Sequence, residues 1–238
     1  MRFKPARLKS GLRLLIAGAK VENPVPNFRL RRSLSLTFLP CSRMNHLAHC
    51  FLSFGDEQLL VGNFSGDFVK GSTWKDYPLR IQRGILLHRA IDVFTDAHER
   101  VRANIARLRP FAGRYAGPVH DVLADHLLSR HWDRHAQEPF EVFAEKTYRC
   151  LEKRVAEMPA VLQERVPHMV AGRFLHSYQS RAGLEWVMAR FSRRLPADFN
   201  AGALISHFFT DIETFSVDFD AFFPELIAHA RLFTAASP

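Results

Sequence analysis

Apolar residues from Met44 onward recur every three or four positions, which is the period of an α-helix. Runs that alternate apolar and polar residues, as strands do, are missing. The pattern predicts helices over 45–54, 58–70 (in whole or in part), 79–97, 100–108, 119–135, 138–157, 160–176, 181–193, 200–210 and 218–233. With 47% hydrophobic residues, the chain is expected to form one all-α domain of about seven to nine helices over residues 44–238.

Positive charge is concentrated ahead of this domain. Residues 1–43 hold ten of the 33 Lys and Arg residues but only one of the 24 acids, Glu22, so the remainder carries 23 of each and is neutral. The formal charge of +9 therefore gives no reason to expect a nucleic-acid partner for the domain. Three interpretations of the leader stay open: a disordered basic arm, a transit-like segment, or upstream sequence from a start assigned too early. We favour the last, because MNHLAHCFLSF opens like a folded element at Met44.

The cysteines and the hydropathy indicate a soluble, cytoplasmic protein with no membrane partner. Cys41, Cys50 and Cys150 form no CxxC pair, and a sparse, odd set fits a reducing compartment. No stretch reaches the eighteen apolar residues that a membrane-spanning helix needs.

Candidate chemistry begins in LLHRAIDVFTDAH, residues 86–98. On a helix, His88, Asp92 and Thr95 share a face of about 60° of arc, and Asp96 lies about 40° further round. Asp96 and His98 are also suited simply to ending the helix. His and Asp at this spacing are either surface residues or ligands of a metal ion.

A second segment, VHDVLADHLLSRHWDRH, places Asp121 and Asp125 one turn apart on a helix that is apolar around most of its circumference. A buried, unpaired carboxylate costs several kcal/mol, so both need cations, hydrogen bonds or protons. A divalent ion between this helix and the helix of residues 86–98 would satisfy them. A structural ion pair of Asp121 with Arg89 or Arg130 is an equal alternative.

Two further segments add ligand types. GNFSGDFVKG contains Asp67 among glycines that allow close approach of the backbone, and MNHLAHCF contains His46 and His49. His46 is better explained as a residue at the helix end. Mixed imidazole and carboxylate ligands suit Mn, Fe, Zn or Mg rather than a structural zinc ion. Such an ion binds phosphoryl oxygens and lowers the pKa of a bound water.

These segments, MNHLAH, GNFSGDFVKG, GILLHRAIDVFTD and HDVLADHLLSRHW, resemble the acyl carrier protein phosphodiesterases, in that family's order. The resemblance implies a helical fold related to the HD phosphohydrolases and a divalent cation, Mn²⁺ foremost, with Mg²⁺ or Fe²⁺ as alternatives. The implied reaction cleaves the phosphodiester between phosphopantetheine and a serine of holo acyl carrier protein, giving the apo form.

The resemblance also implies roles for individual residues. Asp67 matches the family's essential aspartate, Arg89 would neutralise the non-bridging oxygens, and His126 or His49 would protonate the leaving serine. An acidic carrier protein would dock on an arginine cluster. The implied metal ligands are Asp67, His88, Asp92, Asp121 and Asp125. The candidate docking residues are Arg80, Arg83 and Arg89, or Arg173, Arg181, Arg193 and Arg194.

Three alternatives of other kinds remain, and the weakest is nucleic-acid binding, which rests only on the basic leader. The first is a metal-dependent phosphohydrolase on the same scaffold that acts on a nucleotide or a small phosphodiester. The second is a non-catalytic helical binding protein whose His and Asp residues form structural bridges.

Overall fold

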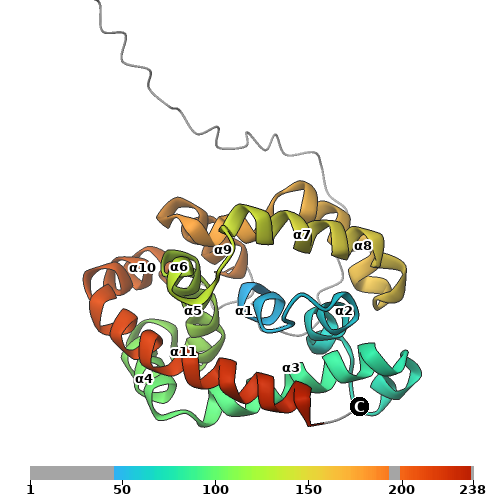
Figure 1. Cartoon of the computed structure of the whole chain (residues 1–238). Helices are drawn as coiled ribbons and strands as arrows, with labels where there is room; N and C mark the ends of the chain where they lie inside the picture. Colours follow the sequence, from blue (N-terminus) through green and yellow to red (C-terminus); the bar gives the residue numbers. More distant parts are fainter. Residues whose placement is uncertain (1–45, 193–198, 237–238) are drawn as a thin grey trace, which may run out of the picture. The chain divides into compact units, whose positions relative to one another are not determined.

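A computed structural model describes residues 46–192 and 199–236, and within these residues it contains eleven α-helices and no strand (Figure 1). Nine of the helices have nine or more residues, the upper end of the predicted range. The helices are α1 (His46–Phe51), α2 (Glu57–Ser65), α3 (Leu79–Ala97), α4 (Glu99–Ala112), α5 (Ala116–Arg130), α6 (Trp132–His135), α7 (Phe140–Lys153), α8 (Ala160–Ala171), α9 (Arg181–Ser192), α10 (Ala201–Thr210) and α11 (Ile212–Ala235). The predicted leader, residues 1–43, lies outside the described residues.

Helices α2 and α3 pack with their backbones in close contact, because a glycine on each helix faces the other. A Cβ atom on Gly62 would lie 2.1 Å from the Ile81 carbonyl oxygen, and one on Gly84 would lie 2.3 Å from the Leu59 carbonyl oxygen. Any larger residue at either position would push the helices apart. This contact sets the distance between the segments that carry Asp67 and His88.

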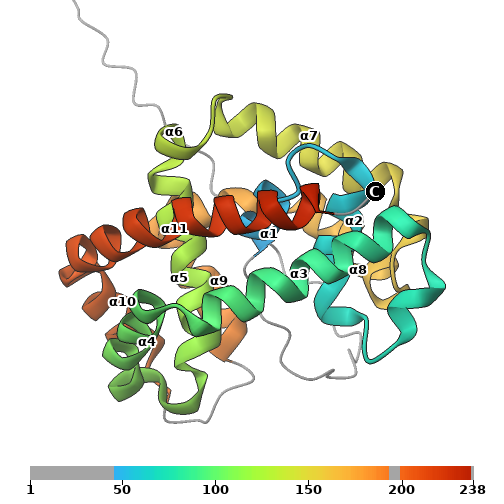
Figure 2. The ribbon, with the colours of Figure 1, turned by 60° about the horizontal axis from the view of Figure 1, so that its bottom comes forward.

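Helix α5 passes through the core, and ten of its fifteen residues are buried. It contacts α1, α4 and α9, while α11 packs along α3 and α4 (Figure 2). Large aromatic side chains fill the space between these helices, and Phe208, Phe215 and Phe223 are among the most deeply buried. The polar residues of α5 are therefore held in an apolar environment, as its sequence predicts.

Several predicted helices differ from the observed ones at their ends. The helix predicted over 119–135 is interrupted at His131, which separates α5 from α6. The helix predicted over 160–176 ends at Ala171, because Arg173 adopts the left-handed conformation (φ 48°) and a 3₁₀ segment, Phe174–Gln179, follows. The last helix starts six residues earlier than predicted, at Ile212 rather than residue 218. None of the described helices combines the length and the hydropathy needed to cross a bilayer.

Candidate metal centre

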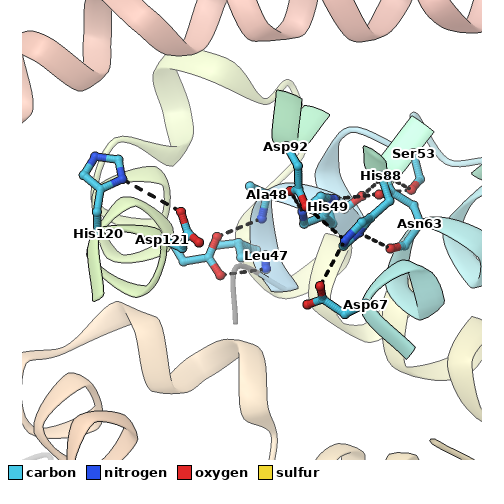
Figure 3. Close-up of polar contacts among 11 residues, drawn as sticks. Leu47, Ala48, His49, Ser53, Asn63, Asp67, His88, Asp92, His120 and Asp121 are labelled. Atoms are coloured by element: carbon cyan, nitrogen blue, oxygen red, sulfur yellow. Dashed lines mark hydrogen bonds and ion pairs between the residues drawn. The ribbon is translucent and has the colours of Figure 1, made fainter. Parts of the chain in front are cut away.

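Two histidines and two aspartates from α1, α3 and the turn after α2 gather at one place (Figure 3). His49 Nε2 lies 3.5 Å from Asp92 Oδ1, and His88 Nε2 lies 3.5 Å from both Asp92 Oδ2 and Asp67 Oδ1. One ligand atom from each of His49, His88 and Asp92 falls within 4.8 Å of the others. The two imidazoles stack with their centroids 4.1 Å apart. The face shared by His88 and Asp92, predicted from their spacing, is confirmed.

Asn63 fixes the orientation of both rings. Its side-chain Oδ1 lies 2.6 Å from His49 Nδ1, and its backbone oxygen lies 2.8 Å from His88 Nδ1. The Asn63 Nδ2 group donates to the His49 carbonyl and to Ser53 Oγ, so Oδ1 can only accept. Both histidines therefore carry their proton on Nδ1 and turn Nε2 toward the carboxylates. Metal-binding histidines are commonly oriented in this way by a partner on the other ring nitrogen.

The two Nε2 atoms are the strongest indication of a ligand. Both are buried, and within the described part of the chain neither has a hydrogen-bond partner. A neutral imidazole with its proton on Nδ1 presents a lone pair at Nε2, and here that lone pair faces carboxylate oxygens that are also acceptors. Such an arrangement needs a proton or a cation between the groups. The donor set of imidazole nitrogen and carboxylate oxygen fits a divalent transition metal ion.

Charges and burial shift the pKa values in a consistent way. Burial lowers the pKa of His49, and the adjacent His88 ring lowers it further against the effect of Asp92. Burial also opposes protonation of His88, but the attraction of the nearby Asp67 and Asp92 carboxylates outweighs it, so the pKa of His88 is raised. Burial raises the pKa of Asp67, but the interactions with His88 outweigh this effect, so its pKa is lowered. Asp67 is thus ionised at neutral pH.

Gly66 allows Asp67 and His88 to approach each other. A Cβ atom at Gly66 would lie 2.2 Å from His88 Cγ, so only glycine fits against this ring. The side chains of His49 and His88 are 2% and 6% exposed, whereas those of Asp67 and Asp92 are 16% and 20% exposed. The imidazoles therefore form the floor of the centre, and the carboxylates lie on its solvent side.

Asp121 and Asp125, which the sequence analysis groups with these ligands, do not join them. Both oxygens of Asp125 accept backbone amides at the start of α1, from Leu47 at 3.0 Å and Ala48 at 2.9 Å. Burial raises the pKa of Asp125 well above its usual range, against the effect of these amides. Asp121 lies apart from His88 in Figure 3, with its Oδ1 3.9 Å from Nδ1 of His120. Ion pairs of Asp121 with Arg89 or Arg130, the alternative from the sequence, are not found among the described residues.

The remaining predicted residues also have other contacts. His126 is buried beside Phe208 and Phe209, and its Nδ1 donates to the Tyr178 carbonyl. Arg89 donates to the carbonyls of Val69 and Gly71, so it holds the loop after Asp67. His46 packs against Phe64 and Phe174 at the start of α1, Asp96 is exposed in the last turn of α3, and His98 caps α4. Their proposed catalytic roles stay predictions.

Asn63, which contacts both rings, is not among the residues predicted from the sequence. The signal was present, because Asn63 stands between Gly62 and Phe64 in GNFSGDF, four residues before Asp67. A polar residue within an apolar helix needs partners in the core, and this one is fully buried. His49, predicted as a proton donor, lies instead where a ligand would be.

Comparisons with known proteins identify the family of this chain. Residues 44–226 match the family model described as acyl carrier protein phosphodiesterase. The chain is similar to the acyl carrier protein phosphodiesterase of Klebsiella pneumoniae subsp. pneumoniae, with 32% identity over 154 residues, 64% of this chain and 80% of that protein. It is also similar to that of Pectobacterium atrosepticum, with 30% identity over 193 residues, 79% of this chain and 98% of that protein. No solved structure matches significantly, so the HD-like architecture stays a prediction.

Proposed function

The chain belongs to the acyl carrier protein phosphodiesterase family and is a phosphoric diester hydrolase, and from that premise we propose that it hydrolyses the phosphopantetheine–serine diester of holo acyl carrier protein with the help of a divalent cation. The products are apo acyl carrier protein and phosphopantetheine. The proposed dependence on a cation rests on one observation. The buried Nε2 atoms of His49 and His88 face the carboxylates of Asp67 and Asp92.

Four residues would hold the cation: His49, His88, Asp92 and Asp67. A divalent ion held there would supply Lewis-acid chemistry toward a phosphoryl oxygen and would activate a water molecule as the nucleophile. Mn²⁺ is the ion that the family resemblance favours, and Mg²⁺ and Fe²⁺ accept similar ligands.

The protein's own residues make this site ready in advance. Asn63 accepts the Nδ1 proton of both imidazoles in hydrogen bonds and fixes the direction of the rings, so little reorganisation is needed when a ligand enters. Asp67 stays ionised because its pKa is lowered, and it lies on the solvent side, where a diester would approach. Arg89 holds the loop that follows Asp67 through two backbone carbonyls, which limits the movement of that loop.

The test is a mass-spectrometric assay of holo acyl carrier protein with the purified chain and Mn²⁺. We expect loss of the phosphopantetheine mass, and we expect His88→Ala to lower the rate by about a thousandfold, since losing the metal removes several kcal/mol of transition-state stabilisation. Metal analysis of both proteins should show the ion in the wild type only. Hydrolysis of small diesters without conversion of the carrier would favour a phosphohydrolase of other specificity. A metal-free, inactive wild type would favour a binding protein.

A further inference from the structure

Three basic side chains surround the loop that carries Asp67. The Arg89 guanidinium donates to the carbonyls of Val69 and Gly71, each at 3.2 Å. Arg165, from α8, places its guanidinium carbon 5.9 Å from the centroid of the Phe68 ring. Lys70 is exposed in the same loop. We call Lys70, Arg89 and Arg165 the basic rim.

The basic rim keeps one arginine that the sequence predicts for docking, Arg89, and leaves out the others, whose contacts are different. Arg80 is paired with Asp56 at 2.8 Å, and Arg181 with Glu185 at 3.0 Å. Arg173 bridges two acids of α7, and Arg83 donates to backbone carbonyls at the end of α11. Arg193 and Arg194 lie outside the described residues.

Within the part of the chain that the structure describes, no carboxylate pairs with any member of the basic rim. The exposed acids nearest in sequence, Asp76 and Glu164, form no ion pair with them. The charges of the rim are therefore not neutralised by an acid among these residues, and Lys70 is exposed next to the loop of Asp67, whose side chain is partly exposed. Arg89 uses one of its nitrogens for the two carbonyls, so other N–H groups remain to contact an anion.

We propose that the basic rim is the surface on which an acidic protein partner docks to present its diester to the centre. This inference rests on the proposed function and names the docking surface for its substrate. A single diester carries one negative charge, whereas the rim supplies three positive charges spread over two helices and a loop. The excess fits a carboxylate-rich protein surface rather than a small diester alone, because such rims raise the association rate and orient the partner.

The experiment measures the Kd of holo acyl carrier protein by biolayer interferometry, with the wild type and the double variant Lys70→Glu/Arg165→Glu. We expect the Kd to rise at least about tenfold and its salt dependence to weaken. Arg102→Glu is the matched control. Arg102 is an exposed arginine of α4, a helix that lies apart from α2 and α8 in both views, and it has no acid partner among the described residues. Metal content and circular dichroism should be unchanged in both variants.

Equal affinities of the wild type and the double variant would overturn the docking surface, as would an equal loss in Arg102→Glu. Because binding is measured without turnover, the proposed function can fail on its own. A carrier protein that binds through the rim but is never cleaved would refute the reaction and leave the docking surface standing. If the carrier is cleaved and the double variant binds it with unchanged affinity, the reaction stands and the docking surface is refuted.

Discussion

Helices α3 and α5 look alike in sequence and differ in what their polar residues contact. Both carry an acidic residue four positions from a second polar residue: His88 and Asp92 on α3, Asp121 and Asp125 on α5. On α3, His88 and Asp92 lie beside His49 of α1, and the Nε2 atoms of the two histidines have no hydrogen-bond partner among the described residues. On α5, Asp125 is saturated by the amides at the start of α1.

The difference teaches that spacing alone does not identify a ligand. A buried carboxylate needs partners for its oxygens, and backbone amides at a helix start can supply them without a cation. Asp125 thus holds the start of α1 in place, and α1 positions His49 at the centre. What marks a metal centre is the combination of fixed rings, unpartnered ring nitrogens and converging carboxylates.

The largest expected effect comes from closing the space beside His88. Gly66→Ala would place a methyl group 2.2 Å from His88 Cγ, so the ring must leave its bond to the Asn63 carbonyl. We expect the affinity for Mn²⁺ to fall 10- to 100-fold. Gly117→Ala is the control, since a Cβ there has no atom within 4 Å. Isothermal titration calorimetry measures both, and equal affinities would refute the arrangement around His88.

A second prediction separates the two helices directly. Asp125→Ala leaves the Leu47 and Ala48 amides without their acceptor, and we expect the free energy of unfolding to fall by about 2 kcal/mol. Metal stoichiometry should stay as in the wild type under native conditions. Denaturant titration and metal analysis provide the two measurements. If the folded variant does not bind the ion, Asp125 is a metal ligand after all.

The smallest effect concerns His126 and pH. Burial lowers the pKa of His126, and the charges of Arg130 and His131 lower it further against the Tyr178 carbonyl. The unfolded chain binds this proton below about pH 6.5 and the folded chain resists it, so His126 destabilises the fold as the pH falls. His126→Asn cannot titrate and keeps an N–H donor. Relative to the wild type, we expect the variant to gain about 1 kcal/mol between pH 6.5 and pH 5, below the limit of about 1.4 kcal/mol per pH unit for one proton.

Denaturant titrations of both proteins at pH 7 and pH 5 give the free energy of unfolding of each. The difference between variant and wild type is then compared between the two pH values. The comparison cancels the groups whose pKa values shift the other way, such as His88 and Asp125, because they are present in both proteins. A stability difference that is the same at both pH values would show that His126 is readily protonated in the folded state.

The local features of the molecule could be predicted from the sequence. The all-α class is confirmed, and the shared face of His88 and Asp92 follows from helical geometry. Asn63 was not predicted as part of the site, because its role depends on two rings, one fourteen and one twenty-five residues away. Of the basic rim, the sequence predicted only Arg89, because the pairing of other arginines with acids such as Asp56 and Glu185 depends on the tertiary structure.

By itself, the sequence determined which helices form, which residues share a helical face, and which family the chain belongs to. These properties depend on periodicity and on residue types that are close together along the chain. The tertiary structure alone decided which buried polar atoms the backbone satisfies, and that the Nε2 atoms of His49 and His88 meet without a hydrogen-bond partner in the described part of the chain. That outcome depends on how α1, α2, α3 and α5 pack, and packing brings together groups that no local pattern relates.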